Sequence, residues 1–144
     1  MAFYLTNAVV TAMMGGTGNQ SLASYVGASP KIRIYSGTVP TNADASLSGN
    51  TQLAELACAT APFSGYTDTG SAARATFGTI ADDSSADATG TATFFRLLKS
   101  DGTTVVAQGE VATSGKELTL NTTAITSGSI VSITSGYFEL PEGG

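Results

Sequence analysis

Residues 89–111 read TGTATFFRLLKSDGTTVVAQGEV, and this stretch decides the fold class. It predicts two β-strands joined by a tight turn at Ser100–Thr103. An Asp-Gly pair between two apolar, β-prone runs is a strong hairpin signal, because glycine adopts positive φ without a Cβ penalty. Phe94 and Phe95 are adjacent, so their rings point to opposite faces of the strand. We expect one ring in the core, and the other under a loop or at an interface.

The flanking sequence adds further short strands separated by turn-rich segments. Strands are predicted at Lys31–Tyr35, Thr51–Cys58, Ala72–Ile80, Glu117–Leu120 and Ile130–Thr134, and Tyr137–Leu140 extends the last or forms another. The segments between them, Gly37–Asn50, Ala61–Ser71 and Asn121–Ser129 among them, are predicted as loops. We expect seven or eight short strands in an all-β, jelly-roll-like antiparallel β-sandwich.

The N-terminal part of the chain has a different pattern. Between Phe3 and Met14 the apolar residues recur at helical spacing, and Gly15-Gly16 ends the run. The sequence therefore predicts a short N-terminal helix, an arm over Thr17–Ser29 and a tail at Pro141–Gly144. The resulting organisation is a helix and arm at 1–29 and a β-sandwich domain at 30–144.

Composition limits the function classes. The 144 residues carry only 12% charged side chains and a net charge of −5, and the six cations are scattered. Direct nucleic-acid binding is disfavoured, because it requires a concentrated patch of Lys and Arg. No apolar run is long enough for a membrane helix, and the first residues lack the basic start of a signal peptide, so we expect a cytosolic origin and no membrane partner.

The sequence contains no candidate catalytic centre. Histidine is absent, which removes the commonest general base and most zinc sites. The acidic loop Asp82–Asp87 could hold calcium, but it lacks the spacing of a calcium loop, and a solvated connection is the favoured interpretation. The single cysteine, Cys58, is expected to be a buried apolar residue, with an intermolecular disulfide as the lesser alternative. We therefore expect no enzyme activity, cofactor or metal.

Several stretches, taken in order, resemble a known class of protein. They are Lys31–Ala45, Ala75–Ile80, Ser84–Ala92, the Phe95–Val106 hairpin and Leu120–Gly128. The pattern resembles small structural proteins of tailed bacteriophages, and it is most similar to a capsid cement, or decoration, protein. The similarity covers roughly residues 30 to 140 and includes no catalytic motif.

The resemblance implies a protein of the virion capsid surface, made in the host bacterial cytoplasm. Such a protein binds the outer surface of the assembled head and ties neighbouring major capsid proteins together, often as a homodimer. The N-terminal helix packs either on its own sandwich or on a partner. A tail, baseplate or head-fibre accessory protein and a carbohydrate-binding β-sandwich module are the alternatives. The residues expected at subunit contacts are Phe3, Leu5, Val9, Met13, Tyr25 and Phe95.

Overall fold

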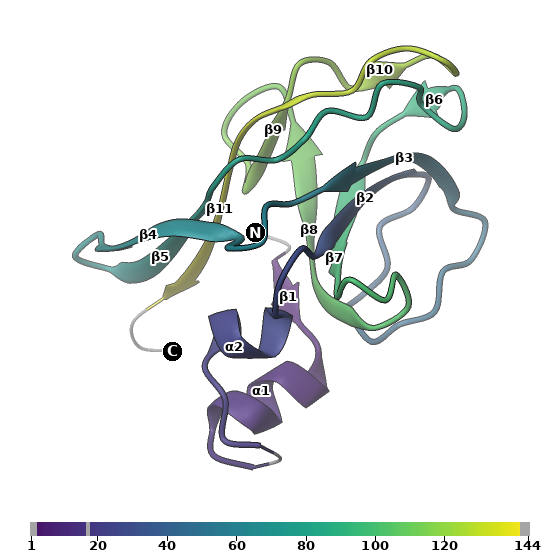
Figure 1. The fold of residues 1–144 in the computed structure, drawn as a ribbon. Coiled ribbons are helices and arrows are strands. Elements are labelled where there is room, and N and C mark those ends of the chain that lie inside the picture. Colours follow the sequence, from purple (N-terminus) through teal and green to yellow (C-terminus); the bar gives the residue numbers. More distant parts are fainter. Residues whose placement is uncertain (1–2, 17, 142–144) are drawn as a thin grey trace.

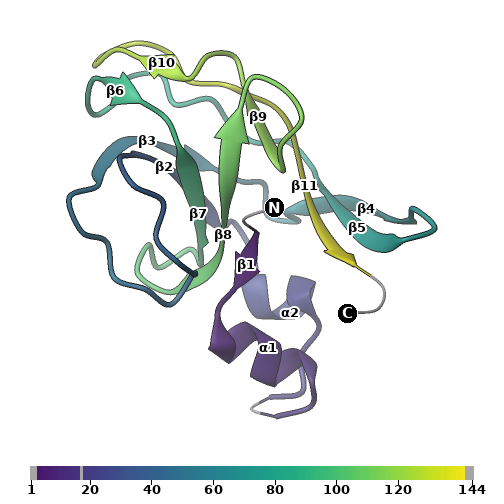
Figure 2. The same cartoon turned by 180° about the vertical axis from the view of Figure 1, so that it is seen from behind.

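The computed structural model describes residues 3–16 and 18–141, and over these residues the protein is mostly β. One large mixed sheet curls into a half-barrel, a small second sheet lies beside it, and two short helices lie together at one end of the molecule (Figure 1; Figure 2). The elements are β1 (Tyr4–Leu5), α1 (Asn7–Met13), α2 (Leu22–Val26), β2 (Lys31–Ser36), β3 (Thr51–Ala57), β4 (Phe63–Asp68), β5 (Ala72–Phe77), β6 (Gly90–Thr91), β7 (Phe94–Leu98), β8 (Val105–Ala112), β9 (Leu118–Leu120), β10 (Ala124–Ile125) and β11 (Ile133–Pro141).

The strand order shows how the half-barrel is built. Within the described residues the large sheet runs β3-β2-β7-β8-β9-β11-β5-β4, with β1 added on β8, while β10 and β6 form the small sheet. The two end strands, β3 and β4, are consecutive in the chain. An isolated bridge between Cys58 and Ile80 links the residues that follow β3 and β5. The curl of the sheet therefore brings its two ends close together at this point.

This topology corrects the predicted antiparallel sandwich. The predominance of β-structure and the N-terminal helix are confirmed, but eight of the strands follow one another in a single sheet, and β8 and β9 are parallel. Residues 113–117 lead the chain back so that Leu118 pairs with Val111 in the same direction. Gly115 has a φ of 71°, a left-handed conformation that allows this short return. No periodicity signals such a switch.

The β7–β8 hairpin is confirmed, and an aspartate fixes its turn. The Asp101 carboxylate accepts hydrogen bonds from the Thr103 and Thr104 amides at 2.8 and 2.9 Å and from the Thr104 hydroxyl at 2.6 Å. These bonds, that of the Thr104 hydroxyl foremost, hold the pKa of Asp101 well below its usual range. Gly102 supplies the positive φ, at 71°. The local chemistry of the turn thus sets the register of the two strands.

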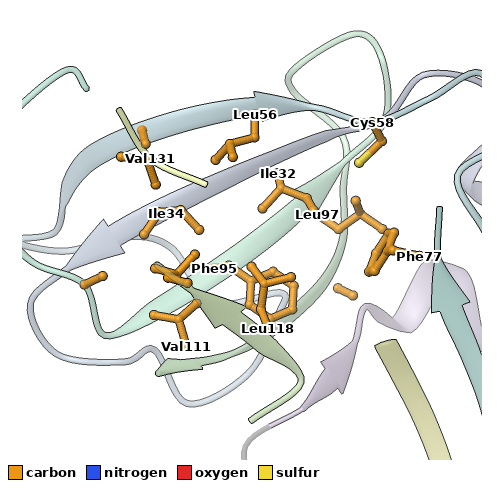
Figure 3. Close-up of a cluster of buried hydrophobic side chains, with 14 of the residues drawn as sticks. Ile32, Ile34, Leu56, Cys58, Phe77, Phe95, Leu97, Val111, Leu118 and Val131 are labelled. Carbon is orange, nitrogen blue, oxygen red and sulfur yellow. The ribbon is translucent and has the colours of Figure 1, made fainter. Parts of the chain in front are cut away.

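Both faces of this hairpin are buried in the chain itself. Phe95 lies in the main core (Figure 3). Gly109 opposite leaves room for its ring, since a Cβ there would lie 2.6 Å from the ring. Phe94 turns to the other face, where its ring stacks on Tyr35 at 5.1 Å. Both phenylalanines are fully buried, so neither ring lies at the surface of this chain.

A long loop covers the second face of the sheet. Residues 37–50 contain no helix or strand, as predicted, and two buried side chains of the hairpin hold them in place. Arg96 donates to the Ala45 carbonyl at 2.6 Å and to the Gln108 amide oxygen at 3.0 Å, and Gln108 donates to the Pro40 carbonyl at 2.8 Å. Burial lowers the pKa of Arg96, whereas Tyr35 and Asp44 oppose that shift.

The N-terminal segment differs from its prediction at both ends. The helix is shorter than predicted because Tyr4–Leu5 pair with β8 as β1, so this segment contributes a strand to the large sheet. The Asn7 amide, at the first turn of α1, donates to the Asp44 carboxylate at 2.9 Å, which ties the helix to loop 37–50. The predicted arm contains α2, whose N-cap Ser21 accepts the Ser24 amide. Residue 17 of the arm lies outside the described residues.

Two further predicted loops contain strands. The segment predicted as a loop at Ala61–Ser71 holds β4, which pairs with β5 in a hairpin that projects from the sheet (Figure 1). The connection predicted at Asn121–Ser129 holds the short β10. The last strand, β11, begins at Ile133 rather than Ile130 and continues to Pro141, the first residue of the predicted tail. The rest of that tail, 142–144, lies outside the described residues.

Candidate functional site

The predicted contact residues all lie on the inward side of their elements. Val9 and Phe95 are fully buried in the main core, so both are core residues rather than surface contacts, which corrects their predicted role. The remaining four are half-buried and pack against that core: Phe3, Leu5, Met13 and Tyr25. The structure therefore places these four side chains against the chain's own core.

Contacts with the sheet explain this orientation. The Phe3 ring lies 4.6 Å from the Phe138 ring on β11, centroid to centroid. On α2, the Tyr25 ring lies 3.9 Å below the Lys99 ammonium group at the end of β7. Val9 and Ala12 form the buried stripe of α1. The helix therefore packs on its own sheet, one of the two arrangements that the sequence left open.

The outward side of α1 carries exposed apolar side chains. Val10 and Met14 are four residues apart on the same helical face and are 40% and 83% exposed. Exposed apolar groups that lie together on a monomer mark interaction sites more often than isolated ones do. We call Val10 and Met14 the outer face of α1.

The outer face of α1 belongs to a segment with no charged side chain. Lys31 is the first charged residue of the chain, so residues 1–30 have none, although 12% of the whole sequence is charged. Solvent-facing helices usually carry charged residues opposite their apolar stripe. The charge distribution is the sequence signal for this surface. An apolar stripe does not indicate it, because such a stripe identifies the face that the fold buries.

A second exposed surface surrounds β4, the end strand of the sheet. Tyr66 on β4 is 68% exposed, the highest value for any aromatic residue of the described chain. Beside it lies a groove of about 460 Å³, mostly lined by apolar atoms, between the β4–β5–β11 strands and α2. Its lining includes Tyr66, Ala75, Phe138, Leu140 and Leu22. The hairpin and α2 thus form one concave apolar surface.

The positive charges of the described residues have partners within the chain. Four of the cations form ion pairs with carboxylates, with N···O distances of 2.6 to 3.5 Å. Lys31 and Arg33 pair with Glu55, Arg74 with Glu139, and Lys116 with Glu110. Arg74 also lies 3.9 Å above the Tyr137 ring. The remaining two, Arg96 and Lys99, contact the Gln108 amide and the Tyr25 ring. Each cation therefore belongs to a local contact that stabilises the fold.

Three structural observations concern metal sites, the single thiol and membrane spans. Among residues 3–16 and 18–141 no group of three or more acidic or cysteine side chains gathers in a way that could hold a metal ion. Burial raises the pKa of the Cys58 thiol to about 12, so it remains protonated at neutral pH. The described helices are all too short to cross a bilayer.

Comparison with protein-family models, curated proteins and solved structures finds no match to this chain. The phage resemblance rests on the residues quoted for it in the sequence.

Proposed function

We propose that this chain is a structural protein of a tailed-phage capsid. In this role it binds the outer surface of the assembled head and cements neighbouring major capsid proteins against the internal pressure of packed DNA. The sequence resemblance supports the class. The observation that carries the contact is the outer face of α1, where Val10 and Met14 are exposed within a segment of 30 residues without a charged side chain.

The fold suits a rigid element that presents such a surface. Three contacts hold the α1 helix in place. Its buried stripe packs on the sheet, the strand before it, β1, pairs with β8, and the Asp44 carboxylate accepts a hydrogen bond from its first turn. A surface fixed in this way loses little conformational freedom on binding. Full burial of an exposed Met or Val side chain contributes about 1.5–3 kcal/mol per residue. A few such contacts give each copy a moderate affinity for the shell.

Many moderate contacts would stabilise the whole head. A ligand that binds only the assembled shell shifts the equilibrium toward assembly by mass action. Copies that bridge adjacent subunits add to one another, because each bridge makes the next contact effectively intramolecular. The low charge density of the chain limits repulsion between copies on a crowded surface. A homodimer would double the contacts made by each bound unit.

The proposal is tested by adding the purified protein to expanded heads of the phage that encodes it. We expect saturable binding to heads and a higher temperature of head disruption. The double variant Val10→Glu/Met14→Glu should lose at least tenfold in affinity, because it would bury charges at the contact. Ile130→Glu is the matched control, since Ile130 is 57% exposed and lies far along the chain, in the connection before β11.

Circular dichroism and thermal unfolding establish that both variants fold like the wild type. Equal loss of binding in the control would contradict the assignment of the contact to α1. Absence of binding to expanded heads, or binding to tails or baseplates instead, would contradict the capsid role itself.

A further inference from the structure

We propose that two copies of this chain pair through their β4 strands, antiparallel about a two-fold axis at Tyr66. The inference rests on the proposed homodimer and deepens it by naming the surface and the register. The two ends of the large sheet differ in how their outward main-chain groups are covered.

The β3 end of the sheet is covered by the chain itself. The Glu55 amide donates to the Asp83 carboxylate at 3.0 Å, and the Leu53 carbonyl accepts the Asp87 amide at 2.8 Å. The Ala57 carbonyl accepts the Ala81 amide at 2.9 Å. Residues 81–87 thus bond three main-chain groups of β3, and covering an edge in this way is how proteins prevent it from pairing with another chain.

The β4 end carries no comparable protection. Within the described residues β4 pairs with β5 alone, and no segment lies along its other edge. The strand, FSGYTD, has no proline or lysine, and its only charge is Asp68. A bulge interrupts its pairing near Phe63, but residues 65–68 pair regularly with β5. An unprotected edge of this kind is a template for an added strand.

The hairpin register shows which groups face outward. The Thr69 amide donates to the Ala72 carbonyl at 2.9 Å and closes the hairpin as a hydrogen-bonded pair. Because such pairs alternate along an antiparallel ladder, Thr67 and Arg74 bond across it, whereas Tyr66 and Asp68 do not. The N–H and C=O groups of Tyr66 and Asp68 therefore point to the open edge.

A second copy fits this edge better than an unrelated strand because the pairing is self-complementary. With the axis at Tyr66, the two Tyr66 residues exchange both main-chain hydrogen bonds. Thr67 then lies opposite Gly65 of the second copy, and Asp68 falls opposite the bulge at Ser64. Like charges directly opposite each other would weaken a cross-strand pair, and this register contains none.

The side chains also gain from this register. Directly paired residues share a face, so the two Tyr66 rings lie side by side on the concave apolar surface. Each Tyr66 ring already lies 6.3 Å from Phe63, centroid to centroid, and Phe63 lies 5.9 Å from Phe138. The pairing would extend one aromatic cluster across both copies and bury the most exposed aromatic side chain of the described chain.

Disulfide trapping tests the register. In Tyr66→Cys, two directly paired cysteines would have Cα atoms about 5.5 Å apart, within bridging range. In the control Thr67→Cys, the two cysteines would be diagonal, about 7–8 Å apart, and poorly placed to bridge. Cys58 is buried with a pKa of about 12 and does not compete. We expect mild oxidation to give covalent dimer from Tyr66→Cys at least tenfold faster than from Thr67→Cys.

Sedimentation of the full chain measures the pairing without a covalent bond. Tyr66→Lys places like charges opposite each other and should weaken self-association at least tenfold, whereas Thr67→Lys, on the other face of β4, should change it less than threefold. A wild-type chain that stays monomeric at about 100 µM, or equal trapping and equal weakening at both positions, would overturn the inference. The self-association experiments do not depend on head binding. Failure of the wild-type chain to bind heads would count against the proposed function and not against the β4 pairing.

Discussion

The two ends of the large sheet, β3 and β4, differ in what covers them. At β3 the residues between β5 and β6 return along the strand, and Asp83 bonds its outward Glu55 amide. At β4 the corresponding groups of Tyr66 and Asp68 face solvent within the described residues. Similar strands in one sheet thus have different roles. The covered end stabilises the fold, and the open end is available to a partner, as is the outer face of α1.

The largest expected effect is a difference in the free energy of unfolding between substitutions on β3 and on β4. Leu56 on β3 is fully buried in the main core, whereas Tyr66 on β4 is mostly exposed. Leu56→Ala should lower the free energy of unfolding by about 2–5 kcal/mol through lost burial and a cavity. Tyr66→Ala should change it by less than about 0.5 kcal/mol. Denaturant unfolding at low protein concentration measures both, and similar losses would contradict the division of roles.

The cover of β3 can be removed without touching the core. Asp83→Ala leaves the Glu55 and Ser85 amides without their carboxylate acceptor and should cost about 1–3 kcal/mol. Asp82→Ala is the matched control, since Asp82 is exposed and makes no side-chain hydrogen bond within the described chain. Thermal unfolding should separate the two variants. If Asp83→Ala matched the control, the cover of β3 would contribute little to stability.

The smallest expected effect is the pH dependence of one ion pair at the covered end. Partial burial raises the pKa of Glu55, but the hydrogen bond and charge of Arg33 outweigh it, so the folded-state pKa lies below its ordinary value. The pair therefore stabilises the fold above about pH 4.3, and this contribution is lost as pH falls through the lower folded pKa.

At pH 7 Glu55→Gln should cost about 0.2–1 kcal/mol, as partly exposed pairs do. The difference from wild type should shrink as the pH is lowered from 5 to 3, measured by urea unfolding at each pH. Asp82→Asn removes the same charge without breaking this pair and serves as the control. A difference that grew on acidification would contradict the assigned direction.

How far the sequence predicted this fold depends on the local signal. The β7–β8 hairpin was predictable because Asp101-Gly102 sits between two apolar runs, and β2 because its residues alternate. The parallel step from β8 to β9 was not, since it depends on the path of residues 113–117 rather than on any strand pattern. Strand β4 gave no clear alternation because most of its residues are exposed.

The same limit applies to the candidate site. Helical spacing identified Val9 correctly as part of an apolar stripe, but that stripe packs on the sheet. For Phe94 and Phe95, adjacency predicted opposite faces and could not reveal that loop 37–50 covers the second face. Val10 and Met14 lie outside this stripe, so helical spacing does not single them out. Their significance comes from the missing charges around them, a property of the whole segment.

Hydrogen exchange of the isolated protein at two concentrations tests the difference between the sheet ends most directly. The Glu55 amide, bonded to Asp83, should be protected at about 1 µM and at 100 µM alike. The Tyr66 and Asp68 amides should exchange rapidly in the dilute sample and become protected in the concentrated one, as β4 pairs with a second copy. Protection of Tyr66 and Asp68 in the dilute sample, or rapid exchange at both concentrations, would contradict the account.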